Sequence, residues 1–253
     1  MAATRGREWF DDDSLWRDLY PFMFPQERSS KGVEEVAQVL ALTQPAGPLN
    51  LCCGPGRHSV ALAQRGLSVT GVDRSEFLLG KAGERAAEAE VDVEWVRSDM
   101  RDFVRPEAFD LALSMFTSFG YFQDKQEDLL VLGNVLESLR PGGKFLIEVM
   151  GKECLARIFQ PTTSEALADG SKLVQRHEVF DDWTRIRNEW LLIRGERVKS
   201  FKFHHTIYSG QELRDRMEGA GFAQVDLYGS LEGDQYGLDA QRLVAVGRKA
   251  ASR

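Results

Sequence analysis

The sequence has few cysteines, no long apolar run and no excess of positive charge. The three cysteines, Cys52, Cys53 and Cys154, are spaced neither as a disulfide framework nor as a set of metal ligands. No stretch approaches the ~20 apolar residues of a membrane span, and residues 1–18 contain no apolar run of signal-peptide length. We therefore expect a cytoplasmic protein that binds neither a metal nor a membrane.

The charge balance bears on the class of partner. Acidic residues number 39 and basic residues 32, which gives a formal net charge of −7. A dedicated binder of nucleic acid or anionic lipid needs a cationic field, so both partner classes are disfavoured. A nucleic-acid substrate held by one local basic patch stays open, as does the choice between a monomer and a homodimer. With 43% hydrophobic residues, the chain can bury a substantial core.

Residues 45–150 alternate short apolar runs with helical patterns. The expected strands are Leu49–Cys53, Ser68–Val72, Val91–Val96, Phe109–Met115 and Phe145–Val149, and the expected helices are Arg57–Arg65, Ser75–Glu88 and Lys125–Leu139. Short apolar strands separated by helices are typical of a parallel sheet that is buried on both faces. This segment is therefore predicted to be an α/β core.

The flanking segments have other patterns. Residues 1–44 are rich in aromatic side chains and helical in pattern. Residues 151–208 contain three extended segments with period-two alternation, in which Phe201, Phe203, His205 and Ile207 share one side and Lys202, His204 and Thr206 the other. Residues 209–253 predict a closing helix and the last two strands. The predicted fold is a mostly parallel, seven-stranded α/β sheet with helices on both faces and an antiparallel insertion after the fifth strand.

A glycine turn, a helix, a strand and an acid follow one another in the core. The turn Cys53-Gly54-Pro55-Gly56 lets the backbone bend sharply and approach a ligand, because no Cβ is in the way. Asp73 ends the next strand, where a carboxylate can accept hydrogen bonds from both ribose hydroxyls of an adenosine. The alternative is an ordinary tight turn in which Asp73 caps the helix near Ser75. The third glycine of a pyrophosphate-binding motif is replaced by Ser59, which favours S-adenosylmethionine over NAD.

From Val33 to Lys249 these residues resemble the class I S-adenosylmethionine-dependent methyltransferases, whose sheet is Rossmann-like. The motifs that carry the resemblance are Asn50-Leu51-Cys52-Cys53-Gly54-Pro55-Gly56, Thr70-Gly71-Val72-Asp73-Arg74-Ser75, Arg97-Ser98-Asp99-Met100, Phe109–Phe116 and Leu139-Arg140-Pro141-Gly142-Gly143. The resemblance implies cofactor contacts from Tyr20, Asn50, Cys52, Gly54, Gly56, His58, Asp73, Arg74, Asp99, Met100, Met115 and Phe116. Two positions depart from the family: Asn50 replaces the usual acid and Cys52 the first glycine.

Residues 115–121 are also similar to amino-sugar N-methyltransferases, which implies N- or O-methylation of a small molecule. Methyl transfer to a nucleophile needs alignment more than acid–base groups, and Tyr121 is our candidate for contact with the acceptor. The alternative is that Tyr121 only packs its loop. The aromatic N-terminal segment with Tyr20, Phe22 and Phe24 is either a lid over the cofactor or a docked helix. Three further interpretations stay open: an NAD-dependent oxidoreductase, a relative that uses the same pocket for other sulfonium chemistry such as aminopropyl transfer, and a cofactor-binding protein without transfer activity.

Overall fold

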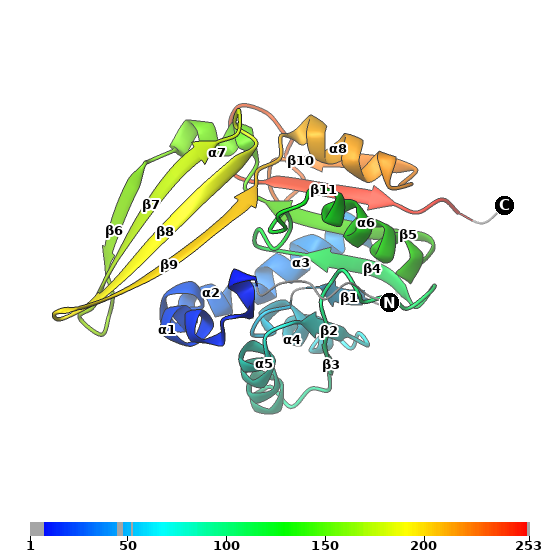
Figure 1. Cartoon of the computed structure of the whole chain (residues 1–253). Coiled ribbons are helices and arrows are strands. Elements are labelled where there is room, and N and C mark those ends of the chain that lie inside the picture. Colours follow the sequence, from blue (N-terminus) through cyan, green and yellow to red (C-terminus); the bar gives the residue numbers. More distant parts are fainter. Residues whose placement is uncertain (1–7, 45–47, 52, 252–253) are drawn as a thin grey trace, which may run out of the picture.

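Two β-sheets organise the chain in the computed structural model, which describes residues 8–44, 48–51 and 53–251 (Figure 1). The larger sheet has seven strands in the order β10-β11-β5-β4-β1-β2-β3. Strands β1 to β5 run parallel, and β11 is antiparallel to both of its neighbours. Their bounds are Pro48–Leu51, Thr70–Asp73, Glu94–Arg97, Phe109–Ser114 and Leu139–Val149 for β1 to β5, with Gln224–Tyr228 for β10 and Leu243–Arg248 for β11.

Helices cover both faces of this sheet, and the alternation of side chains along the strands explains why. On β4, Leu111 and Leu113 pack into one buried cluster with Val36 and Leu62, whereas Ala112 belongs to a second cluster. The first face carries α3 (Gly32–Thr43) and α4 (Arg57–Ala63), and the other carries α6 (Gln126–Ser138) and α8 (Gly210–Gly219). Helix α5 (Glu76–Glu88) packs beside α4 against β2 and β3. Burial on both faces is what the near-continuous apolar strands predicted.

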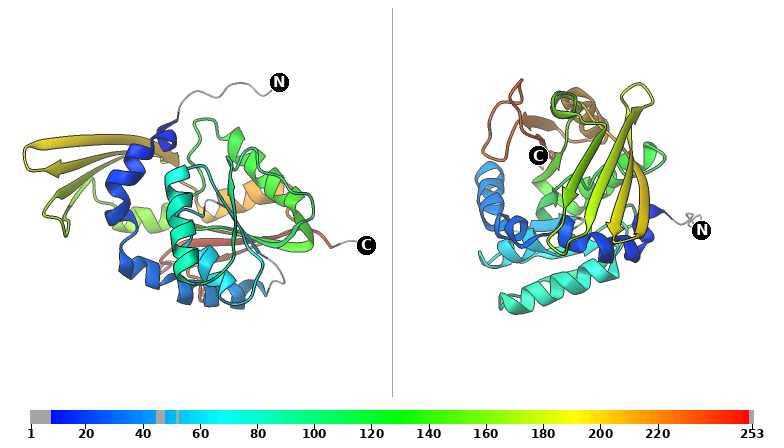
Figure 2. Two further views of the ribbon diagram at one scale, coloured as in Figure 1. Left: turned by 90° about the horizontal axis from the view of Figure 1, so that it is seen from below. Right: turned by 90° about the vertical axis from the view of Figure 1, so that its left-hand side faces the viewer.

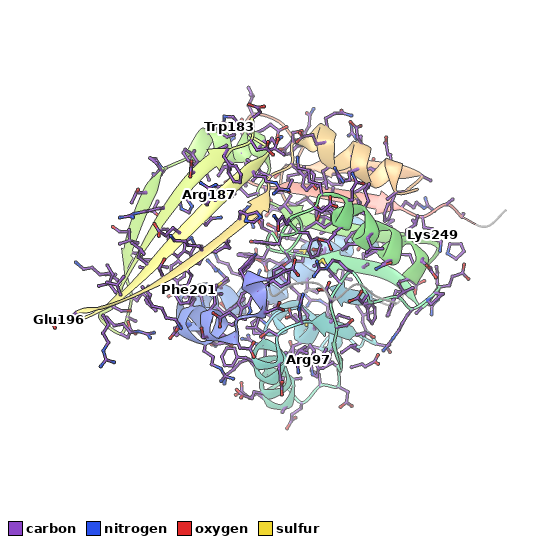
Figure 3. The ribbon with its side chains drawn as sticks, in the orientation of Figure 1. Arg97, Trp183, Arg187, Glu196, Phe201 and Lys249 are labelled. Carbon is purple, nitrogen blue, oxygen red and sulfur yellow. The ribbon has the colours of Figure 1, made fainter. Side chains whose placement is uncertain are left out.

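The second sheet is antiparallel and has four strands in the order β6-β7-β8-β9. The bounds are Thr162–Ala166, Lys172–Phe180, Arg185–Arg194 and Arg197–Thr206, and α7 (Lys152–Ile158) precedes them. It extends away from the core to the tip of the β8–β9 hairpin at Glu196 (Figure 3). The sequence predicted three extended segments here; the structure adds β6 and places all four strands in a sheet separate from the core.

The N-terminal segment lies between the two sheets (Figure 2). It forms a single 3₁₀ turn η1 (Trp9–Asp11) followed by α1 (Asp13–Met23) and α2 (Gln26–Ser30). Leu19 of α1 packs with Leu173 and Phe201 of the four-stranded sheet. Asp18 of α1 pairs with Lys199 at 2.6 Å, and although partial burial opposes it, the hydrogen bonds from Lys199 and Arg194 lower the pKa of Asp18. The segment is thus docked on the second sheet by apolar and ionic contacts.

Some strand limits differ from those expected. The fifth strand was predicted to begin at Phe145, but β5 begins at Leu139 and includes the Pro141-Gly142-Gly143 turn signal. The pairing of β4 with β5 shifts register between Phe109 and Leu111, so the glycines sit in an irregular strand instead of a loop. Among the described residues, no helix is long and apolar enough to cross a membrane.

Candidate functional site

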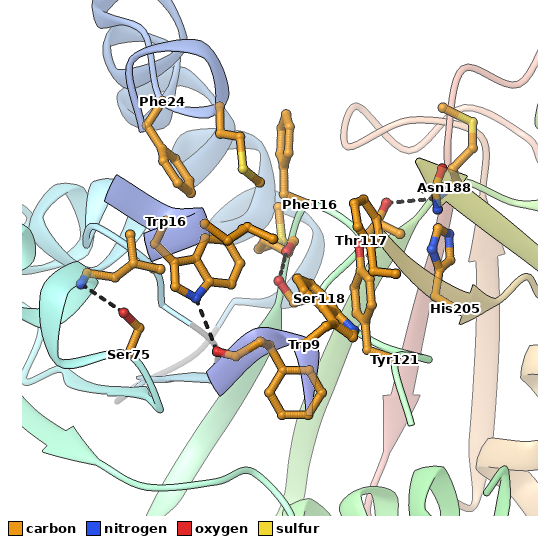
Figure 4. Close-up of a pocket in the computed structure, with 18 of the residues that line it drawn as sticks. Trp9, Trp16, Phe24, Ser75, Phe116, Thr117, Ser118, Tyr121, Asn188 and His205 are labelled. Atoms are coloured by element: carbon orange, nitrogen blue, oxygen red, sulfur yellow. Dashed lines mark hydrogen bonds between the residues drawn. The ribbon is translucent and has the colours of Figure 1, made fainter. Parts of the chain in front are cut away.

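A cavity of about 780 Å³ lies where the parallel strands of the large sheet end (Figure 4). The segments that follow β2, β3, β4 and β5 line one wall, together with the glycine turn after β1. The inward face of the four-stranded sheet lines the opposite wall, and η1 and α1 close the space between them. The carboxyl ends of parallel strands are the usual ligand site in open α/β sheets, and the volume is in the range of ligand pockets.

The glycine turn is tied to the second strand by Asp73. The Asp73 carboxylate accepts a 2.8 Å hydrogen bond from the Gly54 amide and a 2.9 Å bond from the Ser75 amide. Burial raises the pKa of Asp73, and these backbone bonds oppose the rise. Helix α5 is capped by the hydroxyl of Ser75, which accepts from the Leu78 amide at 3.2 Å. Asp73 therefore does more than cap the helix near Ser75, which was the alternative interpretation, because its carboxylate also fixes the glycine turn.

The two glycines of the turn serve different needs. Gly54 has a φ of +54°, and a Cβ at this position would meet only the Phe24 ring at 3.8 Å, so the missing side chain leaves space toward the cavity. Gly56 has a φ of +77°, and its Cβ would lie 2.8 Å from Ala82 and from Trp95. Packing against Ala82 and Trp95 thus requires a glycine at position 56. Among the described residues that line the cavity, Gly56 is not found.

Asp99 lies in a network of charges that joins the core to η1. Its carboxylate pairs with Arg74 and with Arg101, both at 2.7 Å. Arg101 also pairs with Glu8 at 2.5 Å, and Arg74 with Asp11 at 2.5 Å. Although burial opposes it, the hydrogen bonds from Arg101 lower the pKa of Asp99. Asp99, expected beside an adenine, therefore also anchors the segment that closes the cavity. Sequence reasoning missed the roles of Arg101 and Glu8, because only the fold brings them together.

Phe116 is the centre of a cationic cluster. Its ring lies 4.3 Å from the Arg57 guanidinium, 5.0 Å from that of Arg28 and 5.2 Å from that of Arg242. Arg57 pairs with Glu35 at 3.2 Å, and Arg242 pairs with Glu148, whereas no carboxylate among the described residues forms an ion pair with Arg28. The Nη2 group of Arg57 makes this contact with Glu35 without hydrogen-bond geometry in the described structure. The cluster thus carries more positive than negative charge and faces the cavity.

The backbone at this cluster adopts an unusual conformation. Phe116 and Thr117 have φ values of +61° and +56°, which cost free energy in residues with side chains. The Phe116 amide donates a 2.7 Å hydrogen bond to the buried carboxylate of Glu148, and the Thr117 amide donates to the Glu148 carbonyl oxygen at 3.0 Å. These bonds hold the turn after β4 and present the Phe116 ring, 42% exposed, to the cavity.

Of the other residues expected to contact the cofactor, some line the cavity and others do not. Met100 and Met115 line the cavity, as does His58, whose Nε2 lies 2.7 Å from Glu35 and whose pKa is lowered by burial. Tyr20 is not among the lining residues, since its ring packs against Phe24 and Phe77. Cys52 lies outside the described residues, and the side chain of Asn50 does too. For Tyr20, Asn50 and Cys52, a contact with the cofactor stays a prediction.

Tyr121 lies at the far end of the cavity, between the N-terminal segment and the four-stranded sheet (Figure 4). Its ring centroid is 5.1 Å from that of Trp9 and 4.9 Å from that of His205. Trp9 in turn stacks on Phe203 at 4.8 Å. The period-two pattern of residues 201–207 had placed Phe203 and His205 on one side, which agrees with the structure. Sequence reasoning missed Trp9 and Trp16 as lining residues. Of the aromatic residues it favoured, Phe24 lines the cavity, whereas Tyr20 and Phe22 do not.

Comparison with known proteins agrees with this geometry. Residues 49–143 match a family model described as a methyltransferase domain. A putative methyltransferase YqeM from Bacillus subtilis is 26% identical over 179 residues, which cover 69% of this chain and 72% of the relative. Three further curated relatives are 30–32% identical but are matched over only 40–45% of their own length.

Solved structures share the fold. The CcbJ methyltransferase from Streptomyces caelestis superposes with a TM-score of 0.79 at 22% identity, over 93% of this chain and 96% of that one. The S-adenosylmethionine-bound amino pentose methyltransferase CalS10 from Micromonospora echinaspora superposes with a TM-score of 0.65 at 18% identity, over 99% and 100%. Residues 49–143 thus form a methyltransferase domain, and the whole chain shares its fold with S-adenosylmethionine-dependent methyltransferases. The resemblance, the enzyme class and the cofactor expected from the sequence are confirmed.

Proposed function

We propose that this protein transfers a methyl group from S-adenosylmethionine to a nitrogen or oxygen atom of a small-molecule acceptor. One observation carries the proposal. One continuous cavity has Gly54 and Asp73, which we assign to the adenosine, at one end and the aromatic group of Trp9, Tyr121 and Phe203 at the other. Such a cavity can hold two ligands side by side and exclude water from between them.

The residues present fit the cofactor. The turn at Gly54 leaves open space toward the cavity, as a closely approaching ligand needs. Each Asp73 oxygen already accepts one backbone bond and has a lone pair left for a ribose hydroxyl. The excess positive charge of Arg28, Arg57 and Arg242 suits the carboxylate of the methionine moiety. We assign these residues to cofactor binding, with Met100 and Met115 beside the adenosine.

S-adenosylmethionine, when bound, supplies a methyl group on a sulfonium, which is already electrophilic. The chain therefore has to place the acceptor atom in line with that methyl and keep water out. Tyr121 contacts the acceptor, and Trp9 and Trp16 cover the space from the N-terminal side. Burial lowers the pKa of His205 to about 4, with smaller contributions from His204 and His177, so its imidazole is neutral near pH 7. A neutral imidazole can accept a hydrogen bond from an acceptor hydroxyl or amine.

Two alternatives remain to be separated from this proposal. An NAD-dependent oxidoreductase would need a pyrophosphate-binding glycine motif, but the position of its third glycine is occupied by Ser59, which is fully buried in α4. A binding protein without transfer would retain the cofactor end of the cavity and form no methylated product. Support for a small-molecule acceptor comes from the amino pentose methyltransferase that shares this fold.

Calorimetry with S-adenosylmethionine, S-adenosylhomocysteine and NAD tests the proposal. We expect binding of the first two ligands, and we expect Asp73→Asn to weaken it about tenfold, because charge-assisted hydrogen bonds become neutral ones. Asp215→Asn, on the exposed face of α8, is the control and should change nothing. Mass spectrometry of a small-molecule extract incubated with protein and cofactor should then show S-adenosylhomocysteine and a product heavier by one methylene. Selective binding of NAD, or binding without product, would favour the alternatives.

A further inference from the structure

The inward face of the four-stranded sheet carries only neutral side chains into the cavity. Among the described residues, the sheet contributes Thr163, Gln175, His177, Ile186, Asn188, Trp190, Phe203 and His205 to the lining. Charged side chains beside these residues lie on the other face, where Arg176 pairs with Glu189 and Arg187 with Glu178; Arg187 is labelled in Figure 3. Toward the hairpin tip, Lys199 and Arg194 are paired with Asp18 of α1 and do not line the cavity. A sheet with this alternation separates a charged surface from an uncharged chamber.

The strand pairing arranges these neutral groups in rows. His177 of β7 lies opposite Asn188 of β8, and Asn188 lies opposite Phe203 of β9. His177 Nδ1 and Asn188 Oδ1 are 2.8 Å apart, which fixes the orientation of the amide. Asn188 is only 4% exposed, and its Nδ2 group has no hydrogen-bond partner in the described structure. A buried amide donor without a partner costs free energy unless a ligand or water meets it.

Three further groups share this property. Trp9 Nε1, Trp190 Nε1 and His205 Nδ1 are also buried and have no partner among the described residues. The two indole nitrogens can only donate, as can the Asn188 Nδ2 group. The chamber therefore presents donors that a ligand with oxygen or nitrogen acceptors would satisfy. Figure 4 shows Trp9, Asn188 and His205 around Tyr121.

Aromatic rings form the remaining walls. Trp9 stacks on Phe203 with an interplanar angle of 28°, and Trp190 meets the Phe203 ring edge-on at 5.1 Å. Tyr121 and His205 form a second pair, 4.9 Å apart. Flat rings pack favourably against a flat ligand by stacking or edge contacts. The charged lining groups lie on the core side, around Phe116 and Asp99, where we place the cofactor.

We infer that the methyl acceptor is an uncharged, flat ring compound whose carbonyl oxygen or ring nitrogen accepts hydrogen bonds from Asn188 and the two indoles. The inference rests on the proposed function and specifies its substrate class. A cationic amine would find no carboxylate on this face of the chamber. An anion would find no lysine or arginine among the described strand residues that line it. An acceptor amine would accordingly bind as the free base, with its lone pair available for attack.

Three coumarins of similar size test the charge preference: coumarin itself, coumarin-3-carboxylate and 7-(aminomethyl)coumarin. Each is titrated calorimetrically into protein saturated with S-adenosylhomocysteine. We expect coumarin to bind at least about tenfold more tightly than either charged analogue, since an unpaired buried charge is costly. Equal or tighter binding of a charged analogue would overturn the inference, and so would failure of coumarin to bind at millimolar concentration.

Two variants test the role of the amide. Asn188→Leu removes the donor and should weaken coumarin binding about tenfold while leaving the affinity for S-adenosylhomocysteine unchanged. Asn188→Asp keeps the shape of the side chain but introduces a carboxylate. This variant should therefore bind 7-(aminomethyl)coumarin more tightly than coumarin. Glu189→Gln, on the outer face of the same strand, is the matched control. Unchanged coumarin binding in both Asn188 variants would refute the assignment. If the unmodified protein does not bind S-adenosylhomocysteine, the proposed function itself is refuted.

Discussion

Replacing Glu8 by Gln tests whether the N-terminal segment acts as a closure that the cofactor requires. The Glu8 carboxylate accepts hydrogen bonds from Arg101 at 2.5 Å and from Arg74 at 3.2 Å. The Arg101 side chain is 1% exposed and keeps Asp99 as a partner after the change. The cost should therefore stay below that of breaking a whole buried pair, at about 1–2 kcal/mol. This destabilises the docked arrangement of η1 by about five- to thirtyfold.

Limited trypsin digestion and calorimetry measure the effect. Glu8→Gln should speed cleavage at Arg17 by up to about five- to thirtyfold. It should raise the Kd for S-adenosylhomocysteine by at most the same factor, because the Kd rises only as the docked fraction that covers the cavity falls. Glu127→Gln removes another carboxylate from Arg101, at 2.9 Å, but Glu127 belongs to α6 and does not tether η1. It should leave cleavage at Arg17 unchanged. Equal effects of the two substitutions would show that the network only stabilises the fold.

Two further substitutions test the reading of the core. Gly56→Ala should lower the free energy of unfolding by about 2–4 kcal/mol in a urea titration, because its Cβ would lie 2.8 Å from Ala82 at a φ of +77°; Gly80→Ala, where nothing lies within 4 Å, should be neutral or stabilising. Burial raises the pKa of Asp128, whose carboxylate accepts from Tyr208, to about 6. The folded protein then holds this proton more tightly than the unfolded chain, so stability is lost as pH rises through 6. Between pH 4 and pH 7, the free energy of unfolding of Asp128→Asn should therefore fall by about 2 kcal/mol less than that of the unmodified protein. Parallel curves of the free energy of unfolding against pH for the two proteins would contradict this.

The sequence by itself determined the local structure of the core. Burial on both faces requires continuous apolar strands, which is why β4 could be located from its composition alone. Caps are equally local: Ser209 and Glu212 form a reciprocal pair of hydrogen bonds at the start of α8. One helix and one strand separate the glycine turn from Asp73, so their meeting follows from the right-handed crossover that joins the parallel strands β1 and β2.

Only the tertiary structure decided what closes the cavity and what lines its acceptor end. Glu8 and Arg101 are 93 residues apart, and no periodicity relates them. Trp9 and Phe203 stack although almost the whole chain separates them. Asn188 has no sequence signature, because its significance lies in a donor left unpaired after burial. Such contacts depend on how two independently patterned sheets are placed around one segment, and that placement is fixed by the sum of many packing interactions rather than by any local motif.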